Sequence, residues 1–135
     1  MRDEGSAPVE FLAVGVLLLV PVAYLVLTLG RIQAATFAAE SGAREAARVL
    51  AGAGGQDRAE LAVALAVGDQ DLPARGASLT VDCSADPCRT PEAEIAATVR
   101  IDVALPLVPA VLGDVVPLQV PVTVTRVAVV DRFGR

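Results

Sequence analysis

An uncharged run near the start dominates the pattern of hydrophobic and polar residues. Residues 11–30 read FLAVGVLLLVPVAYLVLTLG, without Asp, Glu, Lys or Arg. At about 1.5 Å per residue, a helix of this run is about 30 Å long, the thickness of a bilayer's hydrocarbon core. A cleaved secretory signal has a shorter apolar region followed by a small-residue cleavage site, which we do not find here. We therefore predict a membrane-spanning helix, which Pro21 should kink or deprive of one hydrogen bond.

Beyond the span the helical pattern continues with smaller and more polar residues. Glu40 precedes Arg44 at the i,i+4 spacing that favours an ion pair, and Ala and Glu favour helix over residues 31–51. Small residues recur at every fourth position in two rows, Ala35, Ala39, Ala43, Ala47 and Ala34, Ala38, Gly42, Ala46. Such rows let helices approach closely. They indicate packing against neighbouring subunits or the chain's own sheet, or reflect only an alanine-rich composition.

A second, shorter helix is predicted after the glycines of Gly52–Gly55, which end the first one. Asp57 and Glu60 form a variant capping box at the start of the segment DRAELAVALAV. This segment is apolar at Leu61, Leu65 and the neighbouring Ala and Val, so we expect the helix to lie on the domain.

Alternation of apolar and polar residues predicts strands in the remainder. Ala77–Cys83 and Glu94–Leu105 each have the period of two that marks a half-buried strand. A third strand begins at Leu118, and Pro121 on its polar face favours an edge position. The fold class is therefore α+β, a long N-terminal helix packed on a three-stranded antiparallel meander.

Two irregularities accompany the third strand. The alternation fails at Arg126, where an apolar residue is expected, and a bulge near Thr125 would explain the shift. The preceding segment, residues 106–117, is apolar but too rich in proline for a regular element. We interpret it as a loop over the open end of the core, with a surface that touches the bilayer or a partner as the alternative.

Composition limits the possible functions. The 135 residues allow about one domain, and 54% hydrophobic but 3% aromatic content suits a span plus a small domain packed from Val, Leu and Ala. The net charge is −5, without a basic patch, so we do not expect a nucleic-acid partner. Histidine is absent, and we find no phosphate loop, nucleophile elbow or acid–base pair. We therefore expect no enzyme activity, no cofactor and no small-molecule substrate.

The two cysteines, Cys83 and Cys88, enclose only four residues, SADP, at the turn after the first predicted strand. Outside the cytoplasm a disulfide is the simplest interpretation. A metal site would need Asp82 and Asp86 as additional ligands, whereas structural zinc sites use Cys and His almost throughout, and we expect no metal. Free thiols would follow if the domain faced the cytoplasm.

Gly5 and Glu10 stand just ahead of the span. A carboxylate at the edge of a span is costly and is a functional candidate by default. The segment GSAPVE before a long apolar helix resembles the prepilin-peptidase motif of type IV pilin-like proteins. The resemblance implies cleavage between Gly5 and Ser6, which leaves Ser6 as the new amino terminus. Glu10 would pair with the freed terminus of an axially shifted neighbour, since unpaired charges near low dielectric are costly. The alternative is a chance glutamate that reaches the headgroups.

Within that class the chain resembles the TadE-like family, pseudopilins of tight-adherence (Flp) pilus systems. The likeness rests on the opening G-S-A-x-V-E-F-L, on Arg31 just past the span, and on the run at Ala38–Arg48. Pro8 and Ser6 depart from the major-pilin pattern and favour an accessory subunit over a fibre-forming one. The resemblance implies a role in pilus assembly or priming, with prepilin peptidase, other pilin-like subunits and membrane lipid as partners.

The resemblance also implies a domain division and a topology. Residues 1–5 are the leader, 6–30 the transmembrane helix, 31–51 its helical extension and 57–135 an extracytoplasmic α+β domain. The protein would be a single-pass protein of the cell membrane, with the pilus as a further location. Charge taken alone leans toward the opposite orientation, because arginines lie beyond the span. A competing hypothesis is an uncleaved bitopic envelope protein whose domain binds a wall component or a partner.

Overall fold

The computed structural model describes residues 7–108 and 118–133. Gly5, Ser6 and most of the proline-rich segment that we interpret as a loop therefore lie outside the described residues. The helices and strands, in chain order, are α1 (Ala7–Ala51), α2 (Gln56–Gly68), the short 3₁₀ helix η1 (Ala74–Gly76), β1 (Ala77–Cys83), β2 (Glu94–Ala104) and β3 (Gln119–Val129).

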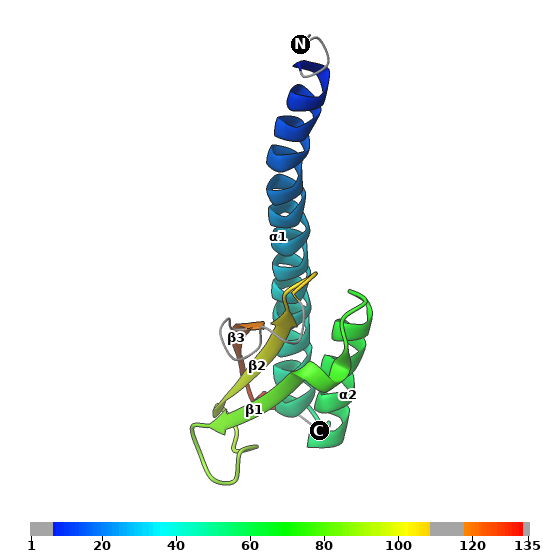
Figure 1. Ribbon diagram of the computed structural model, residues 1–135. Helices are drawn as coiled ribbons and strands as arrows, with labels where there is room; N and C mark the ends of the chain where they lie inside the picture. Colours follow the sequence, from blue (N-terminus) through cyan, green and yellow to red (C-terminus); the bar gives the residue numbers. More distant parts are fainter. Residues whose placement is uncertain (1–6, 109–117, 134–135) are drawn as a thin grey trace, which may run out of the picture.

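The helix α1 is a single rod of 45 residues that includes both the predicted span and its extension. It continues through Pro21, which has no N–H to donate. Its first half projects alone, while its second half lies against α2 and the sheet (Figure 1). It ends at Ala51, where the glycines of the following segment begin, as predicted.

The sheet is antiparallel with the order β1-β2-β3, and this confirms the predicted meander and the α+β class. The central strand β2 supplies three of the four largest fully buried side chains, Ile95, Val99 and Ile101, and its other inward side chains, Ala97 and Val103, are buried too. Pro121 lies on the edge strand β3, where a missing N–H costs no ladder hydrogen bond.

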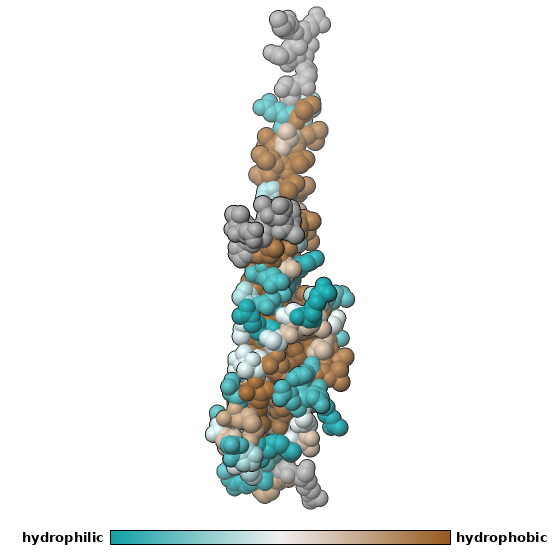
Figure 2. Space-filling view, turned by 60° about the horizontal axis from the view of Figure 1, so that its bottom comes forward, coloured by the Kyte–Doolittle hydropathy of each residue, from teal (hydrophilic) through white to brown (hydrophobic). Residues whose placement is uncertain are grey.

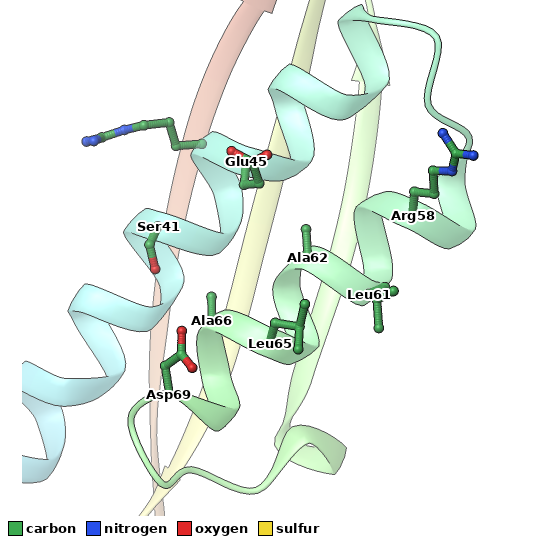
Figure 3. A pocket seen from close by; sticks show the side chains of 9 residues that line it. Ser41, Glu45, Arg58, Leu61, Ala62, Leu65, Ala66 and Asp69 are labelled. Atoms are coloured by element: carbon green, nitrogen blue, oxygen red, sulfur yellow. The ribbon is translucent and has the colours of Figure 1, made fainter.

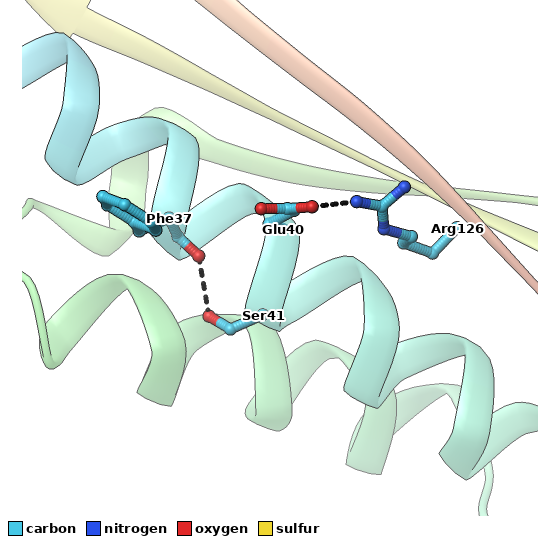
Figure 4. A network of polar contacts seen from close by, with 4 residues as sticks. All are labelled: Phe37, Glu40, Ser41 and Arg126. Atoms are coloured by element: carbon cyan, nitrogen blue, oxygen red, sulfur yellow. Dashed lines mark hydrogen bonds and ion pairs between the residues drawn. The ribbon is translucent and has the colours of Figure 1, made fainter.

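The prediction of a bulge near Thr125 is wrong. β2 and β3 pair without interruption from Glu94 opposite Val129 to Ala104 opposite Gln119. Arg126 therefore keeps its place on the helix-facing side of the sheet, where it forms an ion pair with Glu40 of α1 (Figure 4).

This pair also corrects a second expectation, since Glu40 pairs with Arg126 across the fold and not with Arg44 along the helix. Both side chains are only partly buried. A pair with this exposure contributes about 0–1 kcal/mol, so it adds little to the stability of the domain.

The small residues of α1 pack within the chain itself. Seven of them are buried, Ala35, Ala38, Ala39, Gly42, Ala43, Ala46 and Ala47. A Cβ atom added at Gly42 would lie 3.4 Å from the Cα of Val63 in α2. Of the interpretations left open by the sequence, packing against the chain's own sheet and second helix is therefore the one observed.

The start of α2 differs from expectation, and only some of its apolar residues are buried. The N-cap is Gly55, which has no side chain to accept a hydrogen bond from the first turn, and Asp57 lies inside that turn, where its charge suits the helix dipole. The helix does lie on the domain, but through Ala59, Val63 and Val67, while Leu61 and Leu65 are exposed.

We predict that Gly42→Leu destabilises the domain by about 1–3 kcal/mol, because the new side chain would force α1 and α2 apart. Thermal or denaturant unfolding of the full chain in detergent, followed by circular dichroism, measures the change. Gly15→Leu is the matched control on the same helix, since a Cβ at Gly15 has no neighbour within 4 Å. Equal stability of the two variants would contradict close α1–α2 packing.

Candidate functional site

The free half of α1 is the first candidate site. Its large apolar side chains stand open, with Phe11 78% and Leu17 76% exposed. Figure 2 shows this hydrophobic surface along the projecting rod. Among the described residues α1 is the one helix long and apolar enough to cross a membrane, and none of its most apolar stretch is buried in the molecule. An apolar surface of this extent needs a lipid or protein environment.

Glu10 lies in the first turn of α1 and is exposed. It is the only charged residue of this helix before Arg31. Free N–H groups at a helix N-terminus favour a carboxylate in the first turn. No cationic side chain in residues 7–108 or 118–133 forms an ion pair with Glu10. Within this part of the chain, only the N-terminal end of the helix offsets the negative charge of Glu10. The predicted cleavage site, Gly5 and Ser6, stays a prediction.

A groove between α1 and α2 is the second candidate site (Figure 3). It has a volume of about 490 Å³ and its walls are Ser41, Arg44, Glu45, Arg58, Leu61, Ala62, Leu65, Ala66 and Asp69. Leu61 and Leu65 are 59% and 61% exposed beside it. The groove thus combines two arginines and two carboxylates with exposed leucine side chains.

Sequence reasoning missed this groove because it did not distinguish which of the apolar residues of α2 are buried. Ala59, Val63 and Val67 repeat every fourth residue, as do Leu61 and Leu65, so the helix offers two apolar stripes. The useful signal is size. The stripe with the smaller side chains is the one that can approach the alanine row of α1, and the leucines then remain outside.

Cys83 and Cys88 form the predicted disulfide, with their Cα atoms 5.2 Å apart. The turn is further held by Ser84, whose N–H donates to the Glu94 carbonyl at 2.9 Å and whose Oγ accepts from the Glu94 N–H at 2.8 Å. Both thiols are consumed by the bond, which removes them as ligands for the alternative metal site. In the part of the chain that the structure describes, no three His, Cys, Asp or Glu side chains gather around a possible metal position.

No protein-family model matches the chain, and comparison with curated proteins and with solved structures gave no significant match. The TadE-like resemblance therefore stays a prediction based on the residues quoted above.

We predict that replacing both cysteines by serine lowers the free energy of unfolding by about 2 kcal/mol, because the bond closes only a short loop in the unfolded chain. Denaturant unfolding measures the loss. A reducing agent should destabilise the wild-type protein by the same amount and leave the double variant unchanged. A larger effect of reductant on the wild type would show that the bond does more than restrict the turn.

Proposed function

We propose that this chain is a TadE-like minor pilin or pseudopilin, a structural or assembly component of a tight-adherence (Flp-type) pilus or a related secretion system. It is a substrate of prepilin peptidase and acts through contacts with other subunits in the cell membrane, with its α+β domain outside the cytoplasm. One observation carries the proposal. α1 buries its small-residue half in the domain and leaves its apolar half bare, with a single carboxylate in the first turn.

The bare half of α1 supports assembly through helix contacts. In hydrocarbon it gains little by simple burial against another apolar helix, so a specific polar interaction is needed to select the partner and its register. Glu10 can supply that interaction. Cleavage after Gly5 creates an ammonium group at Ser6, close in sequence to the carboxylate but poorly placed to reach it on the same helix.

A neighbouring subunit displaced along the helix axis brings its own terminus to Glu10. Two opposite charges about 4 Å apart attract by about 4 kcal/mol at an effective dielectric constant of about 20, and each is costly without the other. The pairing therefore favours one axial offset between subunits over all others.

A second candidate function is an uncleaved bitopic envelope protein whose domain binds a partner. The exposed groove between α1 and α2, with Leu61 and Leu65 at its side, favours this candidate because it offers an apolar contact surface without any need for processing. The two candidates differ at the amino terminus of the mature protein.

Intact-mass analysis of protein purified from the native cell separates them. We expect a mature species that begins at Ser6, because the peptidase motif places the cut after Gly5. Gly5→Val should abolish the cut, since a branched side chain replaces the glycine at the cleavage position. Wild-type protein that retains Arg2–Gly5 would contradict the pilin-like function and favour the bitopic alternative.

We predict that Glu10→Ala is still cleaved but assembles poorly with other pilin-like subunits, because the ammonium group of the neighbour then has no partner. Co-purification with those subunits and the yield of surface pili measure assembly. Glu60→Ala, which removes an exposed carboxylate from α2, is the control and should assemble normally. Normal assembly by the Glu10 variant would exclude charge pairing as the source of register.

A further inference from the structure

A second hollow lies where the apolar run of α1 meets the domain. It is an open cleft of about 430 Å³ between one side of α1 and the connection from α2 to η1. Its walls are Val26, Leu27, Gly30, Arg31 and Ala34 on the helix and Gln70, Asp71, Leu72 and Pro73 on the connection. The two walls of the cleft therefore come from segments that are far apart in the sequence, since even their nearest lining residues are Ala34 and Gln70.

The cleft changes from apolar to charged along the axis of α1. Val26 and Leu27 belong to the uncharged run and are 63% and 55% exposed. Gly30 has no side chain and faces open space, since a Cβ built there would have no neighbour within 4 Å. Arg31 follows directly, is exposed, and forms no ion pair with any other residue that the structure describes.

We propose that this cleft holds a phospholipid of the membrane leaflet that faces the domain. The acyl chain lies along Val26, Leu27 and Gly30 with Leu72 opposite, and the Arg31 guanidinium binds the phosphate. The inference rests on the membrane placement of α1 in the proposed function, but it does not require cleavage or pilus assembly.

The position of the cleft identifies lipid as the occupant. The uncharged run ends at Gly30 and is as long as the hydrocarbon core is thick, so Arg31 lies at the level of the headgroups. The apolar wall of the cleft is continuous with the bare surface of the span, which lipid already surrounds. An arginine at the end of a span extends toward the interface, and its planar guanidinium matches a phosphate through two hydrogen bonds.

The negative charge of Asp71 in the cleft limits which class of phospholipid fits. Asp71 also lines the cleft and is exposed. A carboxylate beside the phosphate site disfavours a headgroup with additional negative charge and favours one that carries a positively charged ammonium group. The site therefore suits a zwitterionic phospholipid better than an anionic one, and its occupation would seat the α2–η1 connection on the bilayer surface.

Tryptophan fluorescence tests this placement, because the chain contains no Trp and a single introduced one reports alone. The full chain carrying Gln70→Trp is reconstituted in phosphatidylcholine vesicles whose acyl chains bear bromine near the headgroup. Gln56→Trp is the matched control, also an exposed glutamine, at the opposite end of α2. We expect blue-shifted emission and bromine quenching for Gln70→Trp and neither for Gln56→Trp.

Leu18→Trp, in the middle of the apolar run, tests the membrane anchor separately from the lipid site. If Leu18→Trp is quenched by bromine deep in the acyl chains while Gln70→Trp responds like Gln56→Trp, the lipid site is wrong and the membrane anchor stands. If Leu18→Trp is not quenched at any depth, the membrane anchor and the lipid site both fail.

The role of Arg31 has its own comparison. Added to Gln70→Trp, Arg31→Gln should reduce the quenching, whereas Arg58→Gln, at the far end of α2, should leave it unchanged. If Gln70→Trp is quenched equally when combined with Arg31→Gln and with Arg58→Gln, Arg31 does not bind the phosphate. A different outcome is that the emission wavelength of Gln70→Trp changes with the protein-to-lipid ratio, while brominated lipid does not quench it. That result identifies a second copy of the chain as the occupant of the cleft and also overturns the proposal.

Discussion

The structure depends on how closely the backbone of α1 approaches the rest of the domain. Alanine and glycine on its inner face let α2 and the sheet come into contact with the helix, and the bulk of the core is then supplied by β-branched side chains such as Val63, Val99 and Ile101. Each alanine buries little area, so many must act together, and they do so along a continuous stretch from Ala35 to Ala47. Because α1 is one wall of this core, the domain has no complete interior without it.

Much of the fold follows from local pattern. Burial on one face produces a period of two, so Ala77–Cys83 is recognised with its full bounds, and the long uncharged run identifies the free half of α1. Arg126 shows where the pattern fails. A charged residue on the inner face of a strand looks like a register shift, but its partner Glu40 is 86 positions away and local alternation contains no trace of it. The buried face of α2 could not be chosen among its apolar residues for a related reason, since which stripe is buried depends on the size of side chains on another helix.

The candidate sites were predictable to different degrees. The cysteine pair could be read from spacing and expected compartment. Glu10 stands out by its charge, although the partner proposed for it belongs to another molecule and no property of one chain locates that partner. The cleft at Arg31 could not be predicted, because the connection from Gln70 to Pro73 reaches α1 only after the antiparallel packing of α2 has brought it back along the helix. Sites of this kind arise from chain direction and helix length, which composition does not encode.

The continuity of α1 has a mechanical consequence. No joint separates the part that projects from the part that is clamped by the sheet and α2, so the two halves share one axis. A pull or a twist applied to the projecting end is therefore passed to the domain along the helix backbone, in which Pro21 is the one residue of the uncharged run without an N–H to donate. A partner that binds the projecting end of α1 therefore also fixes the position and the orientation of the folded domain.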